Sequence, residues 1–416
     1  MGRIEELIKE KCPNGVIYKT VGELCDTVTD YVAAGSFKDL ATNVKYLQEP
    51  DYAMLIRTTD IKSKFKGDKL IYIDKSAYDY LWRVHLDKES IILPNIGNCG
   101  EVYYLTPEML PYDNNALATN AILVRSTTCN MRYLKHVFQS INFQEQLKKI
   151  TSPSGQTKFN KTDLKKLKLP VPPLEVQNEI AIILDKFGEL EAELEAELET
   201  RKSQYEFWRG KLLSSVGTIY KLEDICDISA GGTPSKSKSE YWENGTIKWL
   251  GSSVCENKKT VREVTSYITE LGLSKSSAKL LKPGSTLIAM VGATIGKVAY
   301  LDFEACTNQN VACLYPKDTT VISNDYLYYL CTTLYKKFTD LANGSFAIAS
   351  LGFIRNLEVV VPNLERQKYI VDVLDKFEEL TNDMVNGLPA EIEARRKQYE
   401  YYRNKLLSFE EAEVNE

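Results

Sequence analysis

Residues 174–190 read LEVQNEIAIILDKFGEL, and residues 364–380 read LERQKYIVDVLDKFEEL. The second block repeats the first at an offset of 190 residues. A further pair of blocks, QYEFWRGKLLS at 204–214 and QYEYYRNKLLS at 398–408, repeats at an offset of 194. Self-similarity over so long a period indicates that one structural unit occurs twice in the chain.

The segments before these blocks match more loosely. Val21–Asp26 resembles Leu222–Asp227, and residues 90–97 resemble residues 285–292. Close similarity in the helical blocks and loose similarity elsewhere predict helices that share one task and variable domains that perform two different ones. The predicted order is a variable domain at 1–170, a helical spacer at 171–215, a second variable domain at 216–361, and a second helical spacer with a tail at 362–416.

Each variable domain has the sequence pattern of mixed α and β structure. Short β-branched and aromatic runs between Gly, Asn and Pro predict strands. These runs are KLIYID (69–74), SIILPNI (90–96), NAILVRS (120–126), STLIAMVG (285–292), KVAYL (297–301) and NVACLY (310–315). Helical patterns follow at 131–150 and 324–341. The predicted fold class is α+β, with two such domains alternating with two long helices.

The helical blocks carry apolar residues that alternate at spacings of four and three. A sustained 3.5-residue period predicts a coiled coil, and two seams in one chain can pair antiparallel. The first helix, at 1.5 Å per residue, would be a rod of about 57 Å. Its seam residues are Ile180, Leu184, Phe187, Leu194, Leu198, Tyr205, Trp208 and Leu212.

The second seam is interrupted. It starts with Ile370, Leu374 and Phe377, and NGLPAE (386–391) then breaks the helix before the seam resumes at Ile392, Tyr399 and Leu406. The aromatic and basic ends of the two seams, which include Tyr402, predict a docking face for a partner helix. The alternative is that the helices only dimerise the chain or pack on one another.

The net charge of −5 is unevenly distributed. Residues 1–170 carry 24 basic and 20 acidic side chains, and residues 216–361 carry 15 and 14. The helical segments are acidic, with 5 basic and 10 acidic side chains at 171–215 and 8 and 13 at 362–416. An acidic chain average is therefore compatible with DNA binding, because phosphates respond to local basic patches.

Composition also restricts location and metal binding. There is no apolar run long enough to span a membrane and no apolar stretch of signal-peptide length at the N-terminus. The nine cysteines are scattered singly without a C-x-x-C pair, which is typical of reduced, mostly buried thiols in a cytosol. We therefore expect a cytoplasmic protein without a metal site or a cofactor of its own.

The sequence shows no catalytic constellation. GATIGKV at 292–298 lacks the spacing of a phosphate-binding loop and has Val298 after Lys297, so a tight turn is expected. His85 and His136 have no sequence counterparts in the other copy and are expected to be packed or surface residues. We predict that the protein is not an enzyme.

Polar and basic clusters in the variable domains are the candidate DNA contacts. Arg, Lys, Asn and Gln can read base edges, whereas Lys, Ser and Thr contact phosphates. The alternative for each cluster is an ordinary solvated basic loop. The candidates are Arg57, Thr58, Thr59, Lys62, Lys64, Gln156, Lys158, Asn160, Lys236, Lys238, Lys258 and Lys259.

Several stretches resemble the specificity subunit of type I restriction-modification systems across essentially the whole chain. They are PPLEVQNEIAIILDKF, PNLERQKYIVDVLDKF, GLPAEIEARRKQYEYYRNKLLSF, GGTPS…YW…IKWL and GATIGKVA. The resemblance implies two target-recognition domains, each reading one half of a bipartite site in double-stranded DNA. It also implies antiparallel helices that set the distance between half-sites.

The same resemblance implies partners. Two methyltransferase subunits would dock on the helices, and restriction-translocase subunits would join that assembly. S-adenosylmethionine, ATP and Mg²⁺ are then expected only in those partners. Two alternatives stay open: a stand-alone DNA-binding regulator or decoy related to the family, and a structural coiled-coil scaffold without DNA affinity.

Overall fold

The chain forms two compact units in the computed structural model, which describes residues 2–67, 69–152, 155–214, 216–261, 264–341, 348–383 and 386–412. The first unit comprises Met1–Glu193 and Ile392–Glu416, and the second comprises Leu194–Glu391. The boundaries fall inside helices, so each unit combines one variable domain with parts of the helical segments. In the described ranges we find no helix with the length and apolar composition that crossing a membrane requires.

The first variable domain contains two small sheets. The order β2-β8-β5-β6 is antiparallel throughout, and in β4-β3-β7 the strands β3 and β7 run parallel. Buried aliphatic residues on β5 and β8 join the core under helices α6 and α7. The bounds are β2 Thr27–Asp30, β3 Ala53–Ile56, β4 Tyr72–Ile73, β5 Ser90–Pro94, β6 Tyr103–Leu105, β7 Asn115–Leu117, β8 Ala121–Arg125, α6 Met131–Gln139 and α7 Ile141–Ile150.

The second variable domain repeats this topology with one added strand, β13, which pairs parallel with β16. Its larger sheet has the order β11-β18-β15-β16-β13, and in the smaller sheet β14-β12-β17 the strands β12 and β17 again run parallel. The predicted strands and helices of both domains are confirmed. The bounds are β11 Cys226–Ala230, β12 Ile247–Leu250, β13 Lys258–Thr260, β14 Ser266–Ile268, β15 Ser285–Ala289, β16 Val298–Leu301, β17 Cys306–Thr307, β18 Val311–Pro316, α12 Asn324–Thr332 and α13 Tyr335–Leu341.

A two-stranded ribbon closes each variable domain where the long helix begins. In the first unit β1 (Ile17–Thr20) pairs antiparallel with β9 (Lys168–Val171). In the second unit β10 (Thr218–Lys221) pairs in the same way with β19 (Glu358–Val361). The chain therefore enters and leaves each variable domain through neighbouring strands.

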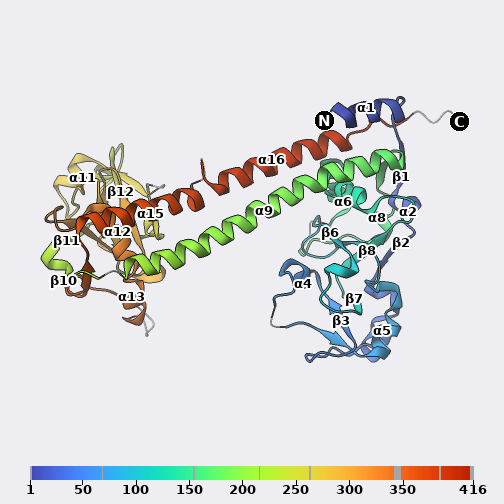
Figure 1. Cartoon of the computed structure of the whole chain (residues 1–416), viewed down its shortest axis with the longest axis horizontal. Helices are drawn as coiled ribbons and strands as arrows, with labels where there is room; N and C mark the ends of the chain where they lie inside the picture. Colours follow the sequence, from blue (N-terminus) through green and yellow to red (C-terminus); the bar gives the residue numbers. More distant parts are fainter. Residues whose placement is uncertain are drawn as a thin grey trace. The chain divides into compact units, whose positions relative to one another are not determined.

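The helical segments form one continuous and one broken helix (Figure 1). Helix α9 runs uninterrupted over 40 residues, Leu174–Leu213. The second segment is divided into α15 (Leu364–Asn382) and α16 (Leu388–Leu407), as NGLPAE predicted. Pro389 is compatible with the start of α16, because the first helical turn needs no donor from the proline nitrogen.

The helices pair antiparallel within the first unit. Phe187 of α9 contacts Tyr399 and Tyr402 of α16, and Glu191, one turn later, pairs with Arg396, which lies earlier in α16. In the second unit Tyr205 of α9 packs on Phe377 of α15. The predicted α+β class with paired long helices is confirmed.

The seam residues differ in burial. Ile180, Leu184, Tyr205, Leu212, Ile370, Leu374, Ile392 and Leu406 are buried, whereas Phe187, Leu194, Leu198, Phe377, Tyr399 and Tyr402 are half-buried. Trp208 is exposed because the neighbouring buried residues, Tyr205 and Leu212, pack into the core of the second variable domain. Trp208 thus lies outside the seam and on the outer face of α9.

The glycines of GATIGKV form a turn, as expected. Gly292 and Gly296 both have positive φ values, 70° and 74°. A Cβ at Gly296 would lie 2.6 Å from the Cβ of Phe338, so the close approach of α13 also requires glycine here. All nine cysteines are free thiols and seven are buried.

Candidate nucleic-acid interface and its supports

Arg57 forms local contacts in the first variable domain. Its guanidinium donates two hydrogen bonds to Asp60, at 2.9 and 2.6 Å, and one to the Lys69 carbonyl at 2.7 Å. Asp60 is buried, so the pair fixes the turn that starts α4 (Thr58–Lys62). Arg57 therefore positions α4, whose first two residues, Thr58 and Thr59, lie half-buried and exposed.

Lys62 and Lys64 lie exposed at the end of α4 and in the turn after it. Lys62 donates to Glu101 at 2.8 Å. Lys64 has a φ of 51°, so the chain turns sharply here and the next residue, Phe65, also has a positive φ. Lys62 and Lys64 both line a groove, together with Glu101.

The other candidates of this domain, Gln156, Lys158 and Asn160, lie in a loop and at the cap of a helix. Gln156 and Lys158 are exposed on a loop that bridges back to Ile96. Asn160 instead caps the short helix α8 (Lys161–Leu164): its Oδ1 accepts from the Asp163 N–H at 2.8 Å, and its Nδ2 donates to the Asp163 carboxylate. Gln156 and Lys158 thus stay available to DNA, whereas the Asn160 amide is engaged.

The four candidate lysines of the second variable domain differ in exposure and in their partners. Lys236 is exposed in a turn, and Lys238 donates to the Tyr241 hydroxyl at 3.0 Å. Lys258 pairs with Glu256 at 2.8 Å. Lys259 is paired with Asp375 of α15 and with Asp325 of α12, so it ties the variable domain to the helix.

A buried glutamine joins the first variable domain to α9. The Gln177 Oε1 accepts from the Asn130 N–H at 2.9 Å and from the Cys129 thiol at 3.0 Å. Its Nε2 donates to the Pro172 carbonyl at 2.7 Å. One side chain therefore binds the start of α6, the end of the ribbon and the first turns of α9.

The same junction recurs in the second unit. The Gln367 Oε1 accepts from the Ser323 N–H at 2.9 Å, and its Nε2 donates to the carbonyls of Val321 and Pro362 at 2.8 Å. Both glutamines are essentially inaccessible, at 1% and 0% exposure. We call these two sites the glutamine junctions. The repeated blocks contain both residues, but the sequence alone did not assign them this role.

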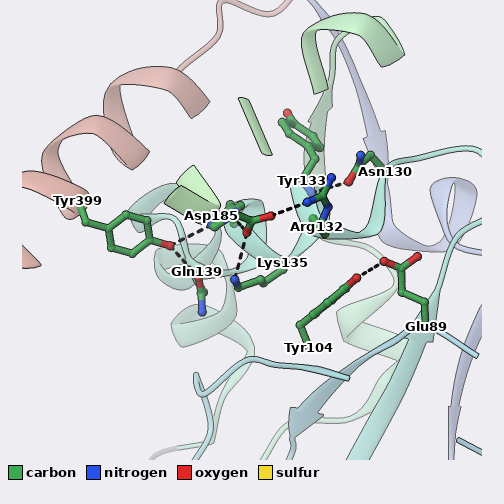
Figure 2. Close-up of polar contacts among 10 residues, drawn as sticks. Glu89, Tyr104, Asn130, Arg132, Tyr133, Lys135, Gln139, Asp185 and Tyr399 are labelled. Atoms are coloured by element: carbon green, nitrogen blue, oxygen red, sulfur yellow. Dashed lines mark hydrogen bonds and ion pairs between the residues drawn. The ribbon is translucent and has the colours of Figure 1, made fainter. Parts of the chain in front are cut away.

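A polar cluster reinforces the first junction about two turns further along α9 (Figure 2). Asp185 of α9 accepts from His136 Nε2 at 2.8 Å and pairs with Arg132 and Lys135 of α6. The His136 Nδ1 lies 2.9 Å from the Tyr399 hydroxyl of α16. His136 thus connects the variable domain to both helices of the first unit.

Tyr329 is the structural counterpart of His136. It lies at the same place in α12, and its hydroxyl donates to Asp375 at 2.5 Å, just as His136 binds Asp185. The two aspartates occupy matching positions in the repeated LDKF sequences. The two residue types differ, so residue identity between the two copies gives no sign of this match.

The burial of His136 predicts a pH-dependent stability. Burial lowers the pKa of His136 below its usual value of 6.5, against the opposing effect of the hydrogen bond that His136 donates to Asp185, and Lys135 and Arg403 add to the lowering. The unfolded chain then takes up the proton first, so stability should fall as the pH drops below about 6.5. Thermal melts from pH 8 to pH 5 should show a smaller decline for H136N than for the unaltered chain; equal declines would contradict this prediction.

The comparisons with known proteins agree with this doubled architecture. The family model described as "Type I restriction modification DNA specificity domain" matches residues 19–200 and 218–394. The chain is similar to the specificity subunit of the Escherichia coli type I restriction enzyme EcoR124I/EcoR124II, with 35% identity over 324 residues, covering 73% of this chain and 78% of that protein.

Two solved structures share the fold. One is the type I restriction-modification S subunit from M. genitalium, with a TM-score of 0.55, 16% identity and coverage of 94% of this chain and 96% of that one. The other comes from work on complex assembly and conformational transition of the type I R-M system. It has a TM-score of 0.59, 17% identity and coverage of 95% and 98%.

Proposed function

Since this chain belongs to the family of type I restriction-modification DNA-specificity subunits, which recognise DNA without catalysing a reaction, we propose that it reads a bipartite site in double-stranded DNA. Each variable domain reads one half-site. The supporting observation is the repeated glutamine junction, which holds two domains with different exposed residues in the same way.

The helices set the gap between the half-sites in this proposal. Helix α9 has 40 residues and no break, which corresponds to about 60 Å at 1.5 Å per residue. B-DNA advances about 34–36 Å per turn. In this proposal, the length of α9 sets the distance between the two half-sites on the DNA, and neither domain contacts the base pairs between them.

Mapping of methylated bases tests this function. The chain is co-expressed with its methyltransferase partner in a host that lacks other modification, and methylated positions are found by long-read sequencing. We expect one motif made of two short specific parts and a gap of constant length. A single continuous motif, or no motif, would contradict bipartite recognition.

The same proposal assigns the outer faces of the helices to two methyltransferase subunits. Phe207 and Trp208 lie exposed on α9 in the second unit, with the Lys211 ammonium over both rings. The repeat relates Phe207 to Tyr401 of α16 in the first unit, and both residues are 62% exposed. Exposed aromatic residues are typical anchors of protein interfaces.

Loss of the aromatic anchors should weaken docking. In F207S/W208S, helix α9 loses these two exposed rings, and affinity for the methyltransferase should fall about thirtyfold, as expected for hot-spot residues. Co-purification should then recover fewer methyltransferase subunits per chain. The control is W82S, because Trp82 is an exposed tryptophan of the first variable domain, 64% accessible against 39% for Trp208.

Equal recovery by F207S/W208S and the unaltered chain would place docking elsewhere. A chain that binds its DNA tightly and never recovers a methyltransferase would instead support a stand-alone regulator or decoy.

A further inference from the structure

A groove of about 670 Å³ in the first unit joins the first variable domain to the helices. It lies between the end of α4, strand β6, helix α6, and the facing parts of α9 and α16. Four cationic side chains and a single carboxylate are among its lining residues: Lys62, Lys64, Lys135, Arg403 and Glu101.

Two of these cations are partly neutralised. Lys62 pairs with Glu101, whose pKa is raised by burial but lowered overall by hydrogen bonds from Lys62 and Tyr103. Lys135 lies 3.4 Å from Asp185. Lys64 has no ion-pair partner among the residues that the structure describes. The groove therefore keeps an excess of positive charge.

Arg403 is held in place by an aromatic ring. Its guanidinium stacks on the Tyr399 ring, 5.1 Å from the centroid. Its Nε is buried, and no acceptor for it lies within the described ranges. The planar fork of a guanidinium matches the geometry of phosphate oxygens, so Arg403 is suited to bind a phosphate at the groove that it lines.

The corresponding groove of the second unit has the opposite character. It measures about 460 Å³ and is lined by two lysines and four carboxylates: Lys258, Lys259, Asp375, Glu378, Glu379 and Asp383. The repeat aligns Glu378 there with Gly188 in the first groove. The basic character of the first groove is therefore a property of these residues rather than of the fold.

We propose that the basic groove of the first unit binds backbone phosphates of double-stranded DNA next to the half-site of the first variable domain, and that the acidic groove of the second unit does not. This inference rests on the proposed function. Helices α9 and α16, through the open position at Gly188 and through Arg403, are then part of the DNA-binding surface in the first unit. The matching surface of the second unit is not.

Gly188 offers a direct test by charge. A Cβ at this position would meet no atom within 4 Å, so both G188E and G188Q fit, and both favour the helix over glycine. The two variants have side chains of the same size and differ by one negative charge. In complex with the methyltransferase, G188E should bind a duplex that carries the mapped site about fivefold more weakly than G188Q, the scale of one phosphate contact.

K64Q and K186Q form a second matched pair. Both lysines are exposed in the first unit, and only Lys64 lines the groove. K64Q should weaken binding to the target duplex and to a scrambled duplex alike, and should lower the slope of log affinity against log salt by about one. K186Q should change neither quantity as much. Methylation maps of all variants should keep the original motif.

The outcomes separate the two proposals. If the unaltered complex prefers its mapped site but G188E binds like G188Q, the groove does not contact DNA while bipartite recognition stands. If ATP, used as a probe instead of the duplex, binds G188Q but not G188E and duplex affinities stay equal, the groove holds a small phosphate ligand and the inference is overturned. If the unaltered complex shows no site preference, the proposed function fails, and this inference fails with it.

Discussion

Removal of one heptad from each paired helix should shorten the gap in the recognised DNA motif by about three base pairs. The change is the joint deletion of residues 190–196 from α9 and 391–397 from α16, segments that include the paired residues Glu191 and Arg396. Seven residues correspond to about 10.5 Å of helix, and a base pair to about 3.4 Å. Deletion of whole heptads keeps the seam on the same face of each helix.

Methylation mapping measures this effect. Both half-site sequences should remain as in the unaltered chain, because neither deletion touches a variable domain. The matched control is a joint insertion of one heptad at the same places, which should lengthen the gap by a similar amount. An unchanged gap in both variants would show that the helices do not set the spacing.

Loss of either glutamine junction should release one variable domain from its helix. In Q177L the Asn130 N–H and the Pro172 carbonyl lose their buried partner. Each unsatisfied group costs about 1–3 kcal/mol, so the first unit should lose about 3 kcal/mol of stability. Hydrogen exchange should become faster in α6, and methylation of the bipartite site should fall strongly.

Q367L is the reciprocal control. It removes the matching contacts to Ser323, Val321 and Pro362, and should increase exchange in α12 rather than α6. If both variants loosened both helices equally, the junctions would act on overall stability and not on the attachment of individual domains.

The sequence predicted those features of the fold that repeat or follow a regular period. The repeated LDKF blocks gave the order of domains and helices, and the spacing of apolar residues gave α9 and the paired seam. The break before α16 followed from Gly387 and Pro389. These features depend on local geometry and on apolar spacing, which can be recognised without knowledge of distant contacts. The exact segment boundaries remain predictions.

The candidate DNA contacts were less accessible to sequence reasoning. Arg57 and Asn160 are engaged by carboxylates three residues away, and Lys259 pairs with Asp375, 116 positions along the chain. A basic residue in a loop has the same appearance in sequence whether a carboxylate or a phosphate is its partner. Arg403 is the opposite case. Its helical block predicted protein docking, and the basic groove that it lines is recognised only in the folded structure.

The ribbons β1–β9 and β10–β19 have a consequence for protein engineering. Thr20 lies opposite Lys168, and Lys221 lies opposite Glu358, so the two ends of the stretch that each ribbon encloses are adjacent across an antiparallel ladder. Directly opposed residues in such a ladder have Cα atoms about 5 Å apart. An interchangeable cassette with this end-to-end distance can be grafted between the ribbon strands without redesigned linkers, so new sequence preferences can be assembled on an unaltered scaffold.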